Sequence, residues 1–373
     1  MPVQGFPAIF SELEIGSNKQ KVQVIADTGS TILWVPDSNV ICYTLPNQTP
    51  FDCTDHGTFD TDDSKTFEFT SDDMEGDYLD GSTMSGIWGL DDIHVGNSTV
   101  QEFEFGVANE TSQIAGVLGL GFYDDSELGD SLSLTLQKQG LINRNAYSVF
   151  LNEINSTGTI LFGAVDHSKC ADELQTVPIV YNKTNPEINV NVLGIDVVVG
   201  NQTFKGPINK EPYLLDTGTA LTQLPNWYLN VLEKELNATF NETQHSITFD
   251  GDCSQLNDIS YSIRFDGKTI KVPVSSLYHE SHDGQCELMV NSDPKSPIIG
   301  VDFLRSMYFV VDLDDREVSL AQAKYSKEQE IELFPQPGVN RTTGNKSEKQ
   351  VSSSSVVGVD ILLCLVVLFT WLV

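Results

Sequence analysis

Residues 24–30 read VIADTGS and residues 213–219 read YLLDTGT, so an apolar run leading into Asp-Thr-Gly occurs twice in one chain. Each copy continues into an apolar stretch that ends in proline, LWVP at 33–36 and LTQLP at 221–225. A single Asp-Thr-Gly is a common tripeptide and is typical of a β-turn. Two copies with matched flanks indicate an internal repeat.

A second pair of segments repeats in the same order. VLGL at 117–120 follows the first copy, and IIGV at 298–301 follows the second at a similar spacing. The shared order predicts two homologous lobes. We assign residues 1–165 to an N-terminal lobe with the first Asp and residues 166–332 to a C-terminal lobe with the second.

The chain as a whole reads as mostly β. Runs such as KVQVI at 21–25 and TFEF at 66–69 alternate or are β-branched, and Gly, Asn and Asp clusters interrupt such runs at short intervals. The best helical candidates are residues 131–139 and 227–236. Many short strands with few helices predict an all-β fold.

The repeated acid suits acid–base chemistry. Glycine lets the backbone approach closely, and the neighbouring hydroxyls can brace the acid. If the two loops face each other, Asp27 and Asp216 share one proton, because two like charges that close cannot both ionise easily. One carboxylate then takes a proton from water, and the other donates one to the scissile carbonyl oxygen. We therefore predict an aspartic endopeptidase whose activity peaks in acid and fades towards neutral pH.

The charge of the chain narrows the classes of partner. It has 53 Asp and Glu against 21 Lys and Arg, a net charge of −32. This balance repels nucleic acid and favours cationic partners. The 6 His are scattered without a His-Glu-x-x-His run, and there is no Cys-x-x-Cys pair. We expect no metal site, and the proposed chemistry needs no cofactor.

The cysteines and sequons favour an oxidising, secretory route. Two short-loop disulfides are the simplest use of the cysteines, but their spacing alone leaves the pairing open. The cysteines are Cys42, Cys53, Cys170, Cys253, Cys286 and Cys364. Recurrent Asn-x-Ser/Thr sequons predict a surface carrying N-glycans. They lie at Asn47, Asn97, Asn109, Asn155, Asn182, Asn201, Asn237, Asn241, Asn340 and Asn345.

The C-terminus resembles a signal for attachment of a GPI membrane anchor. A polar linker rich in Ser and Asn at 333–355 precedes an apolar tail at 356–373. Small residues, a polar spacer and a terminal apolar segment form this signal. Asn345 is the preferred attachment site, with Ser347 and Ser352 as alternatives. The rival interpretation is a tail-anchored helix.

The N-terminus has no matching signal peptide, since residues 1–5 read MPVQG, without a basic start or an apolar run. We expect a chain that lacks its true start. The alternative is a cytosolic variant with a vestigial tail. The predicted location is the cell surface, at the plasma membrane or cell wall.

The two Asp-Thr-Gly loops and the two hydrophobic-hydrophobic-Gly segments resemble the signature of pepsin-like aspartic proteases, over about residues 13–323. The resemblance implies a bilobal β fold with an active-site cleft between the lobes, protein or peptide substrates, and a flap over the bound peptide. Tyr78, Asp80 and Gly81 match the flap, and Trp34 matches the hydrogen-bond partner of Tyr78. The implied dyad-supporting residues are Thr28, Gly29, Ser30, Thr217, Gly218 and Thr219. The implied disulfides are Cys42–Cys53 and Cys253–Cys286.

Three features narrow the resemblance to the GPI-anchored yapsins and the secreted aspartic proteases of yeasts. These are YLDGST at 78–83, FGAVD at 162–166 and the anchor-type tail. Several yapsin relatives cut beside Lys or Arg, which implies a preference for basic residues here. Asp37 and Asp80 are candidates for recognising them.

Two other functions compete with the protease. A non-catalytic peptide-binding homologue usually lacks one Asp or its Gly, and both loops are intact here. A structural or adhesive cell-surface glycoprotein would account for the serine run and sequons, but leaves the repeated Asp-Thr-Gly unexplained. Both copies lie in one chain, which excludes a dimeric retroviral-type protease, and we expect a monomer.

Overall fold

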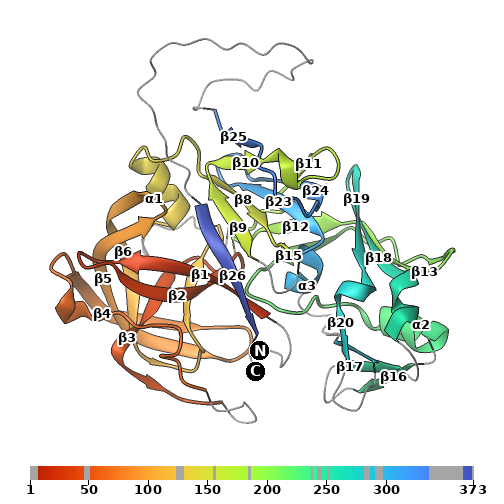
Figure 1. The fold of residues 1–373 in the computed structure, drawn as a ribbon, viewed down its shortest axis with the longest axis horizontal. Helices are drawn as coiled ribbons and strands as arrows, with labels where there is room; N and C mark the ends of the chain where they lie inside the picture. Colours follow the sequence, from red (N-terminus) through yellow and green to blue (C-terminus); the bar gives the residue numbers. More distant parts are fainter. Residues whose placement is uncertain are drawn as a thin grey trace.

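The computed structural model describes residues 7–45, 51–122, 130–153, 157–183, 186–236, 238–241, 246–249, 253–280, 286–289, 297–335 and 364–371. Strands dominate these ranges, and the chain forms two lobes side by side (Figure 1). The predicted all-β, bilobal fold is therefore confirmed.

The first lobe is built on seven strands that curve into one side of a large sheet. They are β1 (Pro7–Ile15), β2 (Gln20–Asp27), β3 (Leu33–Cys42), β4 (Glu68–Asp77), β5 (Thr83–Val95), β6 (Ser98–Thr111) and β7 (Gly116–Gly119). The order is β1-β2-β7-β3-β6-β5-β4, and an additional β1–β5 pairing folds the sheet back on itself. In β2 the alternation of the sequence sets the two faces, with Val22, Val24 and Ala26 buried in the lobe.

The second lobe contains three smaller sheets. One has β12 (Asn189–Val192), β15 (Glu211–Leu215) and β22 (Ile298–Ile299). Another has β14 (Gln202–Phe204), β13 (Gly194–Val199), β18 (Ile259–Phe265) and β19 (Lys268–Pro273). The third has β16 (Ala238–Asn241), β17 (Ser246–Phe249), β21 (Cys286–Met289) and β20 (Tyr278–Glu280).

Strands from both proposed lobes meet in the middle of the molecule, in the continuation of the large sheet. Its order there is β11-β24-β23-β8-β9, with β8 (Ala146–Phe150), β9 (Gly158–Phe162), β11 (Gln175–Pro178), β23 (Met307–Asp312) and β24 (Glu317–Gln322). A two-stranded sheet of β10 (Ala164–Asp166) and β25 (Ile331–Leu333) lies at the edge of this region. The join between β8 and β23 ties the lobes through continuous backbone hydrogen bonds.

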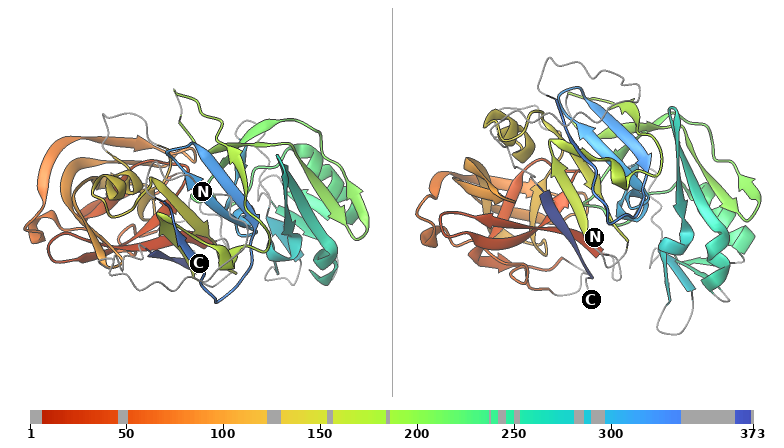
Figure 2. Two further views of the ribbon diagram at one scale, coloured as in Figure 1. Left: turned by 90° about the horizontal axis from the view of Figure 1, so that it is seen from above. Right: turned by 45° about the horizontal axis from the view of Figure 1, so that its top comes forward.

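The C-terminal tail contributes a strand to this sheet. β26 (Cys364–Trp371) lies between β9 and β1 and runs antiparallel to both, with Leu161 opposite Cys364 and Phe10 opposite Leu368. Figures 1 and 2 show it crossing beside β1 at the junction of the lobes. The sequence marked this segment as apolar but gave no sign of its pairing. The remainder of the tail, and Asn345, Ser347 and Ser352, lie outside the described residues.

Helices are few, and both sequence-predicted ones are present. α1 (Leu132–Lys138) begins after Ser131, whose hydroxyl accepts a hydrogen bond from the Leu134 N–H. α2 (Asn226–Leu236) matches the second prediction, and the short α3 (Val301–Leu304) was not predicted. Single 3₁₀ turns are η1 (Thr61–Asp63), η2 (His167–Lys169), η3 (Cys253–Asp258) and η4 (Val274–Ser276). No helix in the described ranges is long and apolar enough to cross a membrane.

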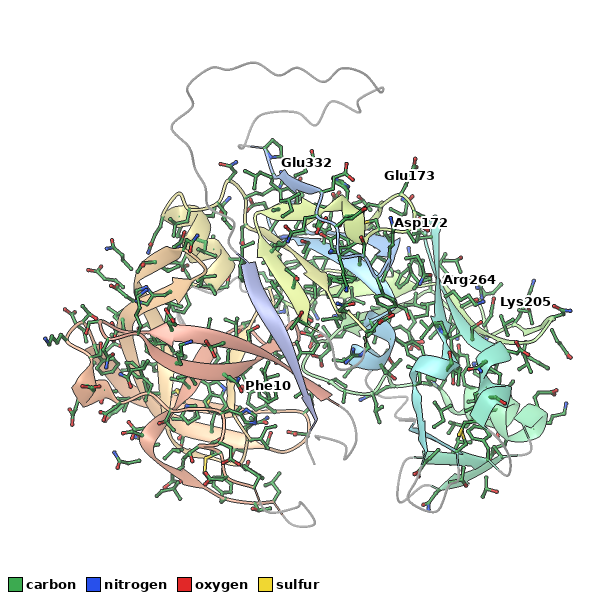
Figure 3. All side chains as sticks on the ribbon, in the orientation of Figure 1. Phe10, Asp172, Glu173, Lys205, Arg264 and Glu332 are labelled. Carbon is green, nitrogen blue, oxygen red and sulfur yellow. A yellow bond between two sulfur atoms is a disulfide. The ribbon has the colours of Figure 1, made fainter. Side chains whose placement is uncertain are left out.

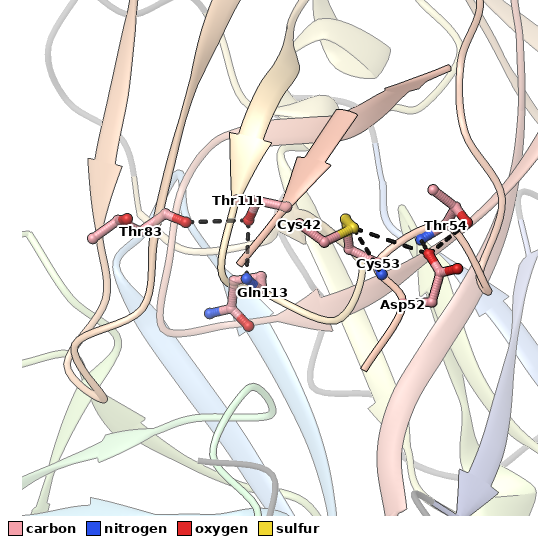
Figure 4. Close-up of a disulfide and its surroundings, with 7 residues drawn as sticks. All are labelled: Cys42, Asp52, Cys53, Thr54, Thr83, Thr111 and Gln113. Carbon is pink, nitrogen blue, oxygen red and sulfur yellow. Dashed lines mark hydrogen bonds between the residues drawn. A yellow bond between two sulfur atoms is a disulfide. The ribbon is translucent and has the colours of Figure 1, made fainter. Parts of the chain in front are cut away.

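Both implied disulfides are present, Cys42–Cys53 in the first lobe and Cys253–Cys286 in the second. Figure 4 shows the first bond next to a turn in which Asp52 accepts hydrogen bonds from the N–H and hydroxyl of Thr54. Cys170 is a free, half-buried thiol.

A partly buried ion pair lies in the second lobe. In the second lobe Arg264 of β18, labelled in Figure 3, donates to Asp196 of β13 at 3.1 Å. The same carboxylate oxygen accepts the Gly206 N–H at 3.0 Å. These bonds satisfy a carboxylate that would otherwise be costly to bury.

The central sheet should carry a large share of the stability. Phe309 of β23 is 0% exposed, whereas Phe69 of β4 is 59% exposed. We expect Phe309→Ala to lower the free energy of unfolding by about 3–5 kcal/mol, because it leaves a cavity between strands of both lobes. The matched change Phe69→Ala should stay within about 0.5 kcal/mol. Urea unfolding of both variants tests this, and equal losses would contradict it.

Candidate active site

The two repeated acids lie on equivalent loops of the two lobes. Asp27 is the last residue of β2, and Asp216 directly follows β15. Each carboxylate accepts the N–H of the glycine two residues later at 2.8 Å, Gly29 in one loop and Gly218 in the other. Both aspartates are buried. The Asp-Thr-Gly sequence therefore turns each acid back over its own loop.

A parallel strand beside each loop fixes the position of its aspartate. β2 pairs with β7 so that Asp27 lies opposite Gly119. β15 pairs with β22 in the same way, and the Asp216 N–H donates to the Ile299 carbonyl at 3.0 Å. The two hydrophobic-hydrophobic-Gly segments thus lie beside the two Asp-Thr-Gly loops, which explains why they repeat together.

The loops are locked to each other by their threonines. The Thr28 N–H donates to the Thr217 hydroxyl, and the Thr217 N–H donates to the Thr28 hydroxyl, both at 3.0 Å. Each hydroxyl then donates to a carbonyl of the opposite lobe, Thr28 to Leu215 at 2.6 Å and Thr217 to Ala26 at 2.7 Å. All of these groups are buried, so the bonds define one relative position of the loops.

This lock brings the two acids together. A β-carbon added to Gly29 would lie 2.8 Å from the Asp216 carboxyl carbon, and one added to Gly218 would lie 2.4 Å from Asp27 Oδ1. Only glycine fits between each acid and the opposite loop. The two carboxyl groups are thus close enough for each to affect the ionisation of the other. The predicted pair is therefore assembled as the repeat required.

The hydroxyls that follow the glycines act differently in the two lobes. Thr219 donates to Asp216 Oδ2 at 2.6 Å. Ser30, expected to brace Asp27, has a buried hydroxyl that makes no hydrogen bond in the described part of the chain. The sequence predicted a hydroxyl brace for both aspartates, but among the described residues only Thr219 braces its aspartate.

Electrostatics keep a proton on the pair. Burial first, and then the negative charge of Asp27, raise the pKa of Asp216 to about 8, against the opposing effect of the Thr219 and Gly218 hydrogen bonds. Below that pH the two carboxyls together hold a shared proton. The proton is retained closer to neutral pH than the sequence alone predicts.

The predicted flap is the turn that joins β4 to β5. The Tyr78 N–H donates to the Ser82 carbonyl at 2.8 Å, and Gly81 adopts a positive φ of 82°, which favours glycine. The Trp34 indole N–H donates to the Tyr78 hydroxyl at 2.6 Å, as the resemblance implied. Burial raises the pKa of Tyr78, so its hydroxyl stays neutral.

A second set of hydrogen bonds holds the base of the flap, and sequence reasoning missed it. Gln113 donates through its side-chain amide to the Ser82 hydroxyl at 2.5 Å, and Ser82 donates to Asp80. Figure 4 shows Gln113 next to Thr111, whose hydroxyl donates to the Thr83 carbonyl at 3.1 Å. No repeat or motif marks Gln113, because its role depends on a contact between distant strands.

A cleft of about 260 Å³ runs past the pair and under the flap. Asp27, Gly29, Ser30, Tyr78, Asp80 and residues 216–219 line it, as expected. Gly81 and Asp37 are not among its lining residues, and Asp37 instead accepts the Asn39 N–H at 2.7 Å. Nothing in this lining supports the candidate role of Asp37 in substrate recognition, which stays a prediction. Leu79 of the predicted flap also lines the cleft, and lining residues that the sequence did not indicate include Asp77, Gln113, Ile114 and Glu187.

The geometry agrees with comparisons with known proteins. A family model of eukaryotic aspartyl proteases matches residues 8–323. The chain belongs to this family. Over 368 residues it is 36% identical to secreted aspartic protease 10 of Candida albicans, with 92% of this chain and 78% of the relative aligned. Over 340 residues it is 37% identical to aspartic proteinase yapsin-3 of Saccharomyces cerevisiae, with 84% of this chain and 66% of the relative aligned.

A further relative is candidapepsin-3 of Candida albicans, 34% identical over 328 residues, with 85% of this chain and 79% of the relative aligned. The chain is thus an aspartic-type endopeptidase, and its substrates are proteins or peptides. The predicted resemblance to yapsins and secreted aspartic proteases is confirmed.

The raised pKa of Asp216 makes stability depend on pH. A carboxyl with a raised folded-state pKa contributes stability that is fully present below its unfolded value of 3.8 and is lost as pH rises through about 8. We expect the thermal unfolding midpoint to fall over this range, and Asp216→Asn to make the fall shallower. Calorimetry at several pH values tests this. Parallel curves for the two proteins would contradict it.

Proposed function

We propose that Asp27 and Asp216 are the catalytic pair that hydrolyses the peptide bond. The observation that carries the proposal is that two buried carboxyls, each beside the glycine of the opposite loop, lie together in the cleft. In the reaction, one carboxylate takes a proton from the attacking water, and the other donates its proton to the scissile carbonyl oxygen. The pair's donors, Gly29, Gly218 and Thr219, hold the acids in place throughout.

The flap completes the site by covering the substrate. Tyr78 is held by Trp34, while Leu79 at the tip is 82% exposed and lines the cleft. An exposed apolar side chain at the tip of a hairpin gains burial when a peptide enters beneath it. Closure of this kind would exclude water from the pair and hold the scissile bond against it.

We further propose a preference for basic residues near the scissile bond. Three acids besides the pair line the cleft, Asp77 and Asp80 on the flap side and Glu187 from the second lobe. Glu187 accepts a hydrogen bond from the Asn189 amide at 2.8 Å, which orients its carboxylate. A Lys or Arg side chain between these walls would be attracted from both sides.

The proposed location is outside the cell or at its surface, as the names of the secreted relatives indicate for those proteins. The sequon residues Asn97, Asn109, Asn182, Asn201 and Asn241 are exposed, which supports N-glycans there. A GPI anchor, attached at Asn345 or nearby, would hold the enzyme at the membrane or wall. Attachment removes the apolar tail, so the β26 pairing and the anchor exclude each other in one molecule. We propose that the enzyme acts as a monomer, because one chain supplies both acids.

Loss of either acid should abolish turnover. We expect Asp27→Asn and Asp216→Asn each to lower kcat by about 10³-fold or more, since neither variant can share a proton as the pair does. Asp37→Asn is the matched control, because Asp37 lies outside the cleft lining. Cleavage of a mixed peptide library at acid pH measures all three. A folded Asp27→Asn enzyme with wild-type turnover would refute the catalytic pair.

The basic preference should depend on Glu187. We expect Glu187→Gln to reduce the selectivity for Lys or Arg over Met by about two- to fivefold, the size of a partly exposed ion pair. Glu173, labelled in Figure 3, is exposed and is not part of the cleft lining, so Glu173→Gln is the control. The measurement is kcat/KM on matched peptides at low and high salt. Equal selectivity in all three proteins would argue against recognition by this carboxylate.

The anchor can be tested on cells that secrete the chain. We expect phosphatidylinositol-specific phospholipase C to release the full-length protein, and deletion of residues 356–373 to send it to the medium. Blotting of membrane and medium fractions reads out both results. Retention on the membrane after either treatment would rule out the GPI anchor.

A further inference from the structure

The second catalytic loop rests on a carboxyl that is not part of the catalytic pair. Asp302 lies at the start of α3, and its Oδ1 accepts the Thr222 N–H at 2.9 Å and the Thr222 hydroxyl at 2.6 Å. The same oxygen accepts the Phe303 N–H at 2.8 Å. Thr222 closes the loop that begins at Asp216. Asp302 therefore fixes the far end of that loop.

Backbone hydrogen bonds join the same two segments. The Val301 N–H donates to the Thr219 carbonyl at 2.9 Å, and the Asp302 N–H donates to the Ala220 carbonyl at 3.2 Å. The Gly300 N–H donates to the Thr222 hydroxyl at 3.0 Å. The Thr222 hydroxyl thus accepts a hydrogen bond from Gly300 and donates one to Asp302. Asp302 therefore helps to fix the position of the loop through Thr222.

The first lobe has the same scaffold without this carboxyl. Leu33 stands six residues after Asp27, as Thr222 does after Asp216, and Gly121 stands two residues after Gly119, as Asp302 does after Gly300. The Gly119 N–H donates to the Ile32 backbone carbonyl at 2.9 Å instead of to a side chain. A β-carbon on Gly121 would lie 2.6 Å from the Ser30 carbonyl oxygen, so no side chain fits there. The carboxyl support belongs to the second lobe alone.

Asp302 is buried, so the free energy of its surroundings depends on whether its carboxyl is charged. Its side chain is buried, and burial raises its pKa to about 6 against the opposing effect of the Thr222 and Phe303 hydrogen bonds and the Arg305 charge. Two ionisable groups face it. Arg305 follows α3, and Tyr261 of β18 has a buried hydroxyl and a ring packed on Phe303 at 5.0 Å. Tyr325 in turn donates to the Arg305 carbonyl at 3.1 Å.

We propose that Asp302 is a positioning residue for Asp216, which holds the second catalytic loop through Thr222 and limits the upper pH at which that loop keeps its geometry. The inference rests on the proposed catalytic pair. In acid Asp302 is neutral and accepts three hydrogen bonds at no charge penalty. Above its pKa a negative charge is buried under a loop that already carries the charge of the pair, with Arg305 as the facing cation.

Two pairs of variants separate the hydrogen bonds from the charge. Asp302→Asn keeps an acceptor oxygen and cannot ionise, so kcat at acid pH should stay within about twofold of wild type. Asp302→Ala removes the acceptor, and kcat should fall about tenfold or more with KM changed by less than about threefold. Thr222→Ser should behave as wild type and Thr222→Val as Asp302→Ala. The threonine pair keeps the test decisive if Asp302→Ala does not fold.

Thermal unfolding tests the charge without using activity. As pH rises from acid to neutral, the thermal unfolding midpoint should fall less in Asp302→Asn than in wild type. The proposal is overturned if Thr222→Val keeps the wild-type kcat. It is also overturned if the unfolding midpoint falls equally in Asp302→Asn and wild type between acid and neutral pH. Failure of the catalytic pair itself would be seen separately, as activity in Asp27→Asn.

Discussion

The active site depends on hydrogen bonds that two threonine hydroxyls make between the lobes. Thr28 and Thr217 each accept an N–H from the opposite loop and donate to a carbonyl beyond it. Buried hydrogen bonds of this kind tolerate little displacement, because an unpaired donor or acceptor in the interior is costly. With the loops fixed, Asp27 and Asp216 must lie against each other. The fold thereby maintains a contact between two acids that would separate if the lobes were free.

That constraint explains why each lobe is built as it is. Each loop needs a strand before it, a glycine that the opposite acid can approach, and a parallel neighbour that sets its height. The central sheet then keeps the lobes in register by continuous backbone pairing from β23 to β8. The apolar segment β26 extends this sheet between β9 and β1, which covers the strand edges on both sides of it.

The lobes share a scaffold but differ in how they support their acid. Asp216 accepts a hydrogen bond from the Thr219 hydroxyl, and Asp302 holds its loop through a hydrogen bond from Thr222. In the Asp27 loop the Ser30 hydroxyl has no hydrogen-bond partner within the described ranges, and apolar Leu33 stands in the position of Thr222. The two loops therefore place two identical acids in different surroundings.

The sequence by itself determined the all-β bilobal fold, the pair Asp27 and Asp216, and both helices, because repeats and periodicities can be read from the local order of residues. The resemblance added the flap with Tyr78, its partner Trp34 and the two disulfides. Only the tertiary structure decided that the Ser30 hydroxyl has no hydrogen-bond partner among the described residues, that Asp37 is not part of the cleft lining, and that Gln113, Glu187 and Asp302 lie around the site. It also placed β26 between β1 and β9. These features depend on contacts between residues far apart in the chain, and the energy of such contacts is set by burial and geometry that no local pattern encodes.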